Sequence, residues 1–215
     1  MYHERTLSRL VKLADQAGVK LAYKSQSRGM RLLGRMLFFR QDFCTDSVTN
    51  LWSTIYFPSR AWVRDNPDLA WQGLAHALVH AHDARRVTRP LYALSYLFPQ
   101  CLALLALLSP WWPGMGLFLL ALLPWPAPFR RHWESRAAAM TLAVWFWQDR
   151  TLHGPPEEIV YAFVGPRYYW CCSGPQQVRA DMQQWLDIIR AKRLGLFIPH
   201  AADVRFAVRM EAAIR

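Results

Sequence analysis

Residues 67–86 of the chain read PDLAWQGLAHALVHAHDARR, a pattern that predicts one long helix. Pro67 suits the first helical turn, and the mostly apolar residues that follow continue to the arginines at the end. Within this helix His76 and His80 stand four residues apart, so both imidazoles lie on one face and can reach a single ion. Histidine pairs at this spacing also arise as ordinary structural residues, so a catalytic metal site requires a further ligand.

The best third ligand is Glu134, one of five glutamates in the chain. It lies within residues 131–150, which we expect to form a helix, and the alanines at 137–139 would let that helix approach the histidine helix closely. A carboxylate that faces an apolar space between helices is costly unless it is paired or bound to a metal. The expected cofactor is therefore Zn²⁺, bound by His76, His80 and Glu134.

Three segments, 54–58, 74–80 and 133–137, carry a resemblance that covers roughly residues 52–147. They resemble the strand, the active helix and the third-ligand helix of the zincin metallopeptidases, whose gluzincin branch takes a glutamate from a following helix. The chain is also similar to small bacterial and phage peptidase-like proteins with a hydrophobic insert. The resemblance implies an α+β, mainly helical fold with a zincin-like core and a short sheet. It also implies a zinc metallopeptidase, a hydrolase that cleaves peptide or protein substrates through a metal-bound water.

Ala77 is the main departure from the family pattern, which has glutamate immediately after the first histidine. That glutamate polarises the bound water and carries its proton to the leaving amine, and a methyl group does neither. The resemblance therefore implies a protein that binds zinc but is hydrolytically inactive. A natural pseudoenzyme and a deliberately disabled copy of an active enzyme both explain this, and the intact ligand set favours the second. Ala138 is another departure, because some gluzincins place an aspartate there.

Asp83 shares the helix face of the two histidines, three residues after His80. It could orient a metal ligand from outside or substitute for one, and a salt bridge to Arg86 or Arg136 is the competing interpretation. Arg136 is also a candidate for stabilising a developing oxyanion. Three tyrosines share that candidacy: Tyr161, Tyr168 and Tyr169.

Thr54, Ile55 and Tyr56 belong to a predicted strand, residues 51–58, which closes at a proline and has the features of an edge strand. An edge strand can bind an extended peptide as an added strand. These three residues are therefore the expected substrate-binding strand.

Residues 91–129 contain no charged residue, which is the main break in composition along the chain. Arginines stand on both flanks, and the positive-inside tendency puts both ends on the cytoplasmic side. We expect an inserted hydrophobic helical hairpin that anchors the protein to the anionic cytoplasmic side of the inner or cell membrane, as a monotopic or re-entrant segment. A helical pair buried in the core or in an oligomer interface is the alternative.

The composition excludes disorder and collagen-like structure, because 53% of the 215 residues are hydrophobic and 19% are charged. The length fits one domain, residues 1–215. A formal charge of +11 favours an anionic partner, for which a membrane surface and nucleic acid compete. Nucleic acid ranks last, because no nucleic-acid module is recognisable. The four cysteines lack the spacing of a zinc or redox motif and indicate a reducing compartment.

The helix expected at 28–40 has arginines on one side, so it is either a basic helix on the same membrane surface or an ordinary packed helix. The other expected elements are helices at 6–14, 175–193 and 201–215, and a loop with a strand at 157–170. A second functional hypothesis is a catalytically silent membrane adaptor or assembly subunit. In that case the hairpin and the arginine-rich surfaces bind partners, and zinc only joins two helices.

Overall fold

The computed structural model describes residues 2–37, 40, 42–149, 154–172, 174–191 and 201–214. In chain order its elements are α1 (Tyr2–Gln16), β1 (Lys20–Tyr23), η1 (Lys24–Gln26), α2 (Arg28–Met36), β2 (Thr49–Leu51), β3 (Thr54–Phe57), α3 (Arg60–Asp65), α4 (Pro67–Val87), α5 (Arg89–Leu97), η2 (Gln100–Leu108), η3 (Pro113–Leu122), α6 (Pro128–Asp149), α7 (Glu157–Val164), η4 (Pro166–Tyr168), α8 (Pro175–Arg190) and α9 (Ala201–Ile214), where η denotes a 3-10 helix. The fold is mainly helical with one small sheet, as the sequence predicts.

The sheet has three strands in the order β1-β3-β2. β1 runs parallel to β3, with Leu21 opposite Ile55, and β2 runs antiparallel to β3, with Asn50 opposite Ile55. The chain reverses between β2 and β3 at Trp52, whose φ of 59° lies in the left-handed region. The single strand predicted at 51–58 is therefore wrong: a turn divides that segment, and its first residue belongs to a separate strand.

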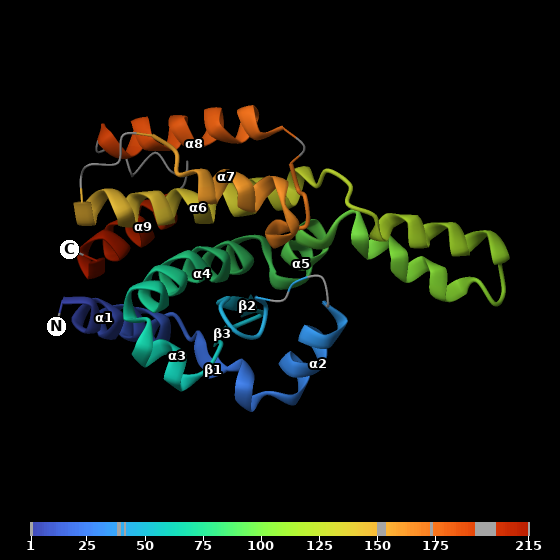
Figure 1. Ribbon diagram of the computed structural model, residues 1–215, viewed down its shortest axis with the longest axis horizontal. Coiled ribbons are helices and arrows are strands. Elements are labelled where there is room, and N and C mark those ends of the chain that lie inside the picture. Colours follow the sequence, from blue (N-terminus) through green and yellow to red (C-terminus); the bar gives the residue numbers. More distant parts are fainter. Residues whose placement is uncertain are drawn as a thin grey trace.

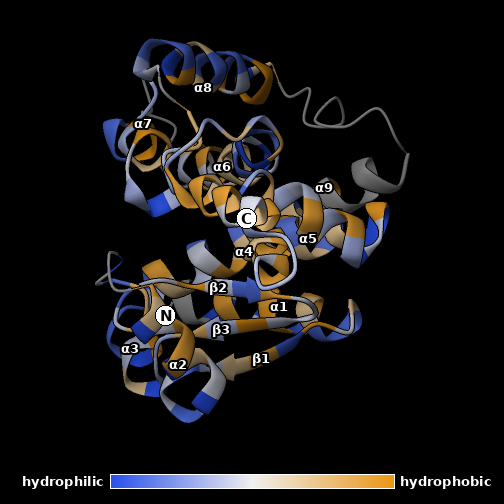
Figure 2. Ribbon diagram, turned by 90° about the vertical axis from the view of Figure 1, so that its right-hand side faces the viewer, coloured by the Kyte–Doolittle hydropathy of each residue, from blue (hydrophilic) through white to orange (hydrophobic). Residues whose placement is uncertain are grey.

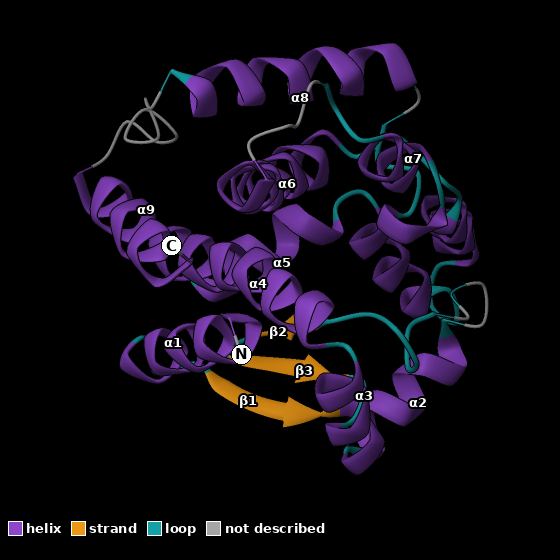
Figure 3. Ribbon diagram, turned by 60° about the vertical axis from the view of Figure 1, so that its left-hand side comes forward, coloured by secondary structure: helices purple, strands orange, loops and turns teal. Residues whose placement is uncertain are grey.

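The sheet lies at one end of the molecule, with α1 and α4 packed over one face (Figure 3). α4 is the central helix of the first hydrophobic core, where Trp71 and Leu74 pack with Leu10 of α1, Ile55 of β3 and Ile214 of α9. All five side chains are fully buried. A helix with buried residues on most of its surface needs partners on several sides, which the sheet, α1 and α6 supply.

α6 lies between two hydrophobic cores and is the second central helix. Its Ala137 and Val144 belong to the core shared with α4, whereas Leu142 belongs to a second core with Val160 of α7 and Met182 of α8. Figure 2 shows hydrophobic segments of α4 and α6 in the middle of the molecule, and Figure 3 shows α8 on the side of α6 away from the sheet. The small alanines on α6 allow close approach to α4.

Residues 98–127 connect α5 to α6 and include a hairpin formed by η2 and η3, which projects away from the body (Figure 1). The projecting part is shorter than the predicted segment 91–129, because α5 covers residues up to Leu97 and packs against α4 and α6. Among the described helices none is long and apolar enough by itself to cross a membrane. Arg89–Leu97 and Gln100–Leu108 reach the length and composition only as a pair, bent by 92°.

The helices predicted near residues 6–14, 28–40, 67–86, 131–150, 175–193 and 201–215 are all confirmed in type, although the second ends earlier, at Met36. Residues 38–39, 150, 192–193 and 215 of these predictions lie outside the described residues. The loop and strand predicted at 157–170 are wrong, because Glu157–Val164 is helix α7. The β-branched and aromatic residues there favoured a strand. Two acidic residues in the first turn and apolar side chains at 159, 160 and 163, which are buried on one face, explain the helix.

Candidate metal centre

α4 and α6 bring together the three residues that the sequence predicts as metal ligands. His76 and His80 stand one helical turn apart on α4, and Glu134 faces them from α6. One ligand atom from each side chain lies within 4.8 Å of the other two, so the three residues could hold a metal ion. The prediction that a carboxylate beyond the apolar insert folds back onto the histidine pair is confirmed.

Three short distances define the cluster. His76 Nε2 and His80 Nε2 are 3.3 Å apart, and Glu134 Oε2 lies 3.4 Å from the first and 3.5 Å from the second. The three atoms therefore form a nearly equilateral triangle. Of the His76–Glu134 pair, the His76 side chain is 22% exposed, whereas that of Glu134 is 2% exposed.

The outer nitrogen of each imidazole is held by a hydroxyl group. Tyr92 Oη lies 2.8 Å from Nδ1 of His80, and Thr141 Oγ1 lies 3.2 Å from Nδ1 of His76. Because Thr141 donates its own hydrogen to the carbonyl of Ala137, it is free to accept one from His76. A hydrogen on Nδ1 leaves Nε2 unprotonated and aimed at the centre of the triangle, which is the form that binds metals.

The two carboxylate oxygens of Glu134 have different surroundings. Oε1 accepts a hydrogen bond from the hydroxyl of Tyr96 on α5. Oε2 is buried and has no hydrogen-bond partner, although it is the atom nearest both histidine rings. A buried oxygen without a hydrogen-bond donor is costly. A cation at the centre of the triangle would satisfy it.

The electrostatics of the cluster favour an ionised carboxylate. Burial alone would raise the pKa of Glu134, but the charge of His80, together with that of His76, outweighs it and holds that pKa well below its usual range. Burial lowers the pKa of His76. Burial also opposes protonation of His80, but the carboxylates of Glu134 and Asp83 reverse this and raise the pKa of that ring. Glu134 is therefore an ionised carboxylate that faces both imidazoles.

Asp83 and Arg136 form a buried ion pair with each other. Nη2 of the arginine lies 2.6 Å from Oδ1 and Nε lies 2.9 Å from Oδ2, and the side chains are 7% and 0% exposed for Arg136 and Asp83. The salt-bridge interpretation of Asp83 is confirmed for Arg136. Asp83 is not part of the cluster of possible ligands among the described residues, so its role as a substitute ligand is not supported. The guanidinium group of Arg136 is engaged by Asp83.

Ala77 is 3% exposed and belongs to the apolar core around α4. Its methyl group offers neither a charge nor a hydrogen-bonding atom to the neighbouring histidines.

The expected substrate-binding strand is not at an edge. Thr54, Ile55 and Tyr56 belong to β3, which is hydrogen-bonded to β1 on one side and β2 on the other. The prediction that an extended peptide adds to this strand is wrong, because both sides of its backbone are already paired. The closing proline that suggested an edge stands after the last paired residue, so it removes no hydrogen bond from the sheet.

Of the three candidate tyrosines, Tyr168 lies beside the cluster. Its ring is parallel to that of His76, with an interplanar angle of 8° and centroids 6.4 Å apart. Tyr161 is instead 64% exposed on α7, and the hydroxyl of Tyr169 donates to the carbonyl of Leu122 in the hairpin.

Three residues that contact the ligands were not predicted from the sequence: Tyr92, Tyr96 and Thr141. Tyr92 and Tyr96 stand four residues apart in an otherwise apolar run, the same spacing as the histidine pair, and this was the available signal. Thr141 follows Glu134 by seven residues, which places both on one face of α6.

The four cysteines provide no part of this centre. Cys171 and Cys172 are buried in the second core, and burial raises the pKa of the Cys171 thiol to about 12. Both side chains therefore belong to the packing of that core. The chain was also compared with models of known protein families, with curated proteins and with solved structures, and none of them matches it.

Proposed function

We propose that the protein binds one zinc ion through His76, His80 and Glu134, in the site of a zincin-like metallopeptidase that lacks its general base. The observation that carries the proposal is the size of the ligand triangle. Zinc–nitrogen and zinc–oxygen distances of about 2.0–2.1 Å place tetrahedral ligands about 3.3–3.4 Å apart. The three edges here are 3.3, 3.4 and 3.5 Å.

The choice of zinc rests on donor chemistry. Two imidazoles and one carboxylate form the ligand set of several catalytic zinc sites, which keep a fourth position for water or substrate. The partial exposure of His76 supports such an open position. When bound, zinc supplies a Lewis acid that polarises a carbonyl oxygen and makes water a better nucleophile.

The surrounding residues prepare the three ligands. Tyr92 and Thr141 hold the outer nitrogens of His80 and His76, which fixes the direction of both rings. Tyr96 holds one oxygen of Glu134 and leaves the other for the ion. These contacts come from α5 and α6, so the ligand geometry is maintained by three helices.

Catalysis needs a group that takes a proton from water and passes it to the leaving amine. Ala77 occupies the place of that group, and the nearby Asp83 is already engaged by Arg136. We therefore expect strong metal binding and no measurable peptide hydrolysis in the chain as it stands.

Zinc binding is tested by titration of the metal-free protein with ZnCl₂, followed by competition with a chelator of known affinity. We expect one zinc ion per chain, and a loss of about 100-fold or more in affinity in His80→Ala, because one of three ligands is removed. His82→Ala is the matched control, since it removes an imidazole from the same helix outside the cluster. Equal zinc affinity in His80→Ala and the unmodified protein would contradict the proposal.

Hydrolysis is tested by Ala77→Glu, with Ala77→Gln as a control of the same size without a basic carboxylate. If the site is that of a disabled peptidase, Ala77→Glu cleaves casein or a peptide library in a zinc-dependent manner and Ala77→Gln does not. Circular dichroism of both variants checks that the buried position accepts the larger side chain.

A second candidate function is a silent adaptor in which zinc joins α4 and α6. The burial of Ala77 in the apolar core favours it, because a carboxylate there would be costly. This candidate predicts that zinc stabilises the fold while a folded Ala77→Glu variant shows no cleavage.

A further inference from the structure

The η2–η3 hairpin leaves large apolar side chains exposed on several sides. Leu117 and Leu120 are 71% and 56% exposed, and Leu119 and Leu122 are 57% and 50% exposed. In a helix with about three residues per turn, these two pairs lie on different faces of η3. On η2, Leu104 and Leu107 are 66% and 72% exposed. Because this apolar surface extends around the hairpin, it suits an apolar environment that contacts the hairpin on all sides.

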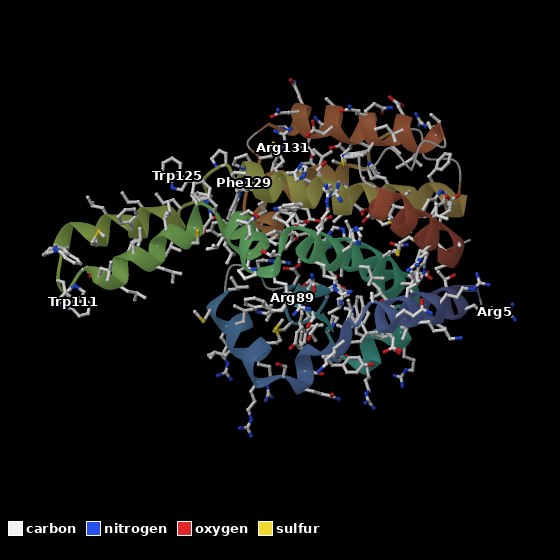
Figure 4. The ribbon with its side chains drawn as sticks, turned by 180° about the vertical axis from the view of Figure 1, so that it is seen from behind. Arg5, Arg89, Trp111, Trp125, Phe129 and Arg131 are labelled. Atoms are coloured by element: carbon white, nitrogen blue, oxygen red, sulfur yellow. The ribbon has the colours of Figure 1, made fainter. Side chains whose placement is uncertain are left out.

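Aromatic residues mark both ends of the hairpin (Figure 4). Trp111 lies at the tip and is 71% exposed, as is the adjacent Trp112 at 63%. Trp125 and Phe129 lie at the base, 49% and 52% exposed. Exposed aromatic residues at the base, where the apolar hairpin meets the polar body, are typical of proteins that sit in a bilayer interface.

Arginines flank the hairpin segment in sequence, whereas residues 91–129 carry no charge. α2 lies at the same end of the molecule as the base of the hairpin (Figures 1 and 4). It exposes Arg28, Arg31 and Arg35 together with Leu32 and Met36, which are 59% and 68% exposed. A helix that exposes arginines and large apolar residues together is suited to the surface of an anionic bilayer.

The length of the hairpin matches half of a bilayer better than a whole one. η2 has nine residues and η3 has ten. At about 2.0 Å per residue these helices are about 18–20 Å long. The hydrocarbon core is about 30 Å thick, so one leaflet provides about 15 Å. The hairpin also enters and leaves on the same side, because both of its ends join the body.

We propose that residues 98–125 insert into one leaflet of an anionic bilayer and that α2 lies on the headgroups beside them. α5 connects this insertion to the candidate metal centre. Its Tyr92 and Tyr96 contact the ligands, and Phe98, the first residue of the inserted segment, follows the last residue of α5. Arg130 at the other end of the hairpin donates to the carbonyl of Tyr96 and to the side chain of Gln100. Insertion therefore holds the cluster close to the membrane surface.

The test is co-sedimentation of the full chain with two kinds of vesicle, one of phosphatidylcholine alone and one that also contains about 30% phosphatidylglycerol, an anionic lipid. We expect binding that is stronger to the anionic vesicles. Leu117→Asp should lower the partition coefficient by about 100-fold, since it places a charge in hydrocarbon. Val208→Asp is the matched control, because Val208 is 58% exposed on α9 at the other end of the molecule and should leave binding unchanged.

The contribution of α2 is tested by the double variant Arg31→Gln with Arg35→Gln. Two charges removed from the headgroup surface should lower binding to anionic vesicles by about 30-fold. Arg5→Gln with Arg9→Gln is the control, because it removes the same number of charges from α1. Arg5 lies at the end of the molecule away from the hairpin (Figure 4). Equal losses in both double variants would show attraction by net charge alone and overturn the assigned orientation.

The depth of insertion is tested with lipids brominated along the acyl chains. Quenching of tryptophan fluorescence should occur on binding and decrease in Trp111→Leu with Trp112→Leu. A chain that forms a stable dimer in buffer, binds no vesicles and becomes monomeric in Leu117→Asp would instead show that the hairpin docks onto a second copy, and it would overturn the proposal. None of these measurements requires zinc, so they are independent of the proposed metal site.

Discussion

The candidate metal centre and the η2–η3 hairpin lie close together in the chain, but one buries ionisable side chains and the other exposes apolar ones. The cluster buries ionisable side chains between α4, α5 and α6, and hydroxyl groups hold each of them: Tyr92 on His80, Thr141 on His76 and Tyr96 on Glu134. The hairpin exposes leucine and tryptophan and carries no charge. Burying ionisable groups and exposing large apolar groups to water are both unfavourable in free energy.

From this difference we infer that the two regions bind different partners. A buried carboxylate oxygen without a donor needs a cation, and an exposed apolar surface needs an apolar medium. The interior therefore has polar groups that the fold has already oriented, whereas the hairpin has apolar groups that the fold leaves uncovered. Four experiments test this contrast.

The largest expected effect is on the ion pair beside the cluster. Asp83→Ala removes the partner of Arg136, which is itself 6% exposed, and leaves an uncompensated buried charge. We expect a loss of about 3–5 kcal/mol in the free energy of unfolding, measured by urea denaturation. The double variant Asp83→Leu with Arg136→Met should recover much of this loss, because it leaves no unpaired charge. A double variant as unstable as the single one would contradict this explanation.

The next effect compares a leucine of the core with a leucine of the hairpin. Leu142 on α6 is fully buried, and Leu142→Ala should cost about 2–5 kcal/mol of folding free energy. Leu117 is 71% exposed, so Leu117→Ala should change stability in buffer by less than about 0.5 kcal/mol. Thermal and urea unfolding of both variants measure the difference. A similar cost at both positions would mean that the hairpin packs against protein in solution.

A smaller effect is expected from the hydroxyl that orients His80. Tyr92→Phe keeps the ring, which lies 5.1 Å from that of Trp133 between centroids, but removes the hydroxyl 2.8 Å from Nδ1. We expect zinc affinity to fall about 10-fold to 100-fold with little change in the fold. The more distant phenol of Tyr161 provides a control, and Tyr161→Phe should leave zinc affinity unchanged.

The smallest expected effect is on the pH dependence of the free energy of unfolding, about 1 kcal/mol per pH unit, and it comes from a buried lysine outside the cluster. Lys24 is fully buried and donates to the carbonyl of Ser47 at 2.6 Å and to its hydroxyl at 2.9 Å. Burial, with the charge of Arg40, lowers the pKa of Lys24 from 10.5 to about 7. Between these values the unfolded chain holds the proton and the folded chain does not, so stability rises with pH.

The rise attributable to Lys24 should be about 1 kcal/mol between pH 7 and about pH 8. Lys24→Met should lack this increment, although it also leaves the Ser47 carbonyl without its donor and lowers stability overall. Urea denaturation of both proteins at the two pH values separates the slope from the offset. Parallel pH dependence of the two proteins would show that Lys24 stays charged in the folded state.

Much of the metal site was predictable from local spacing. The four-residue interval of His76 and His80 puts both rings on one helix face, and few glutamates were available as a third ligand. The outer contacts were harder to predict, because Tyr92 and Tyr96 reach the ligands only when α5 folds back against α4 and α6. The pairing of Asp83 with Arg136 likewise depends on how those helices pack.

The helices were more predictable than the sheet. Helical periodicity at α1, α4 and α8 is a property of neighbouring residues, so one segment reveals it. β3 was recognised as a strand, but its place between β1 and β2 depends on residues 20–23, more than thirty positions away. The proline after β3 suggested an edge because the pairing partners of a strand are not written in its own sequence.

Three features can be read from the chain alone: the spacing of the two histidines, the positions of the long helices, and the charge-free segment with arginines on both flanks. These properties depend on residues within a few turns of one another. Three others are visible only in the folded molecule: Glu134 closes a triangle of 3.3–3.5 Å with the histidines, Asp83 is paired, and β3 is central. The reason is that such contacts join segments tens of residues apart, and their geometry follows from how whole helices and strands pack.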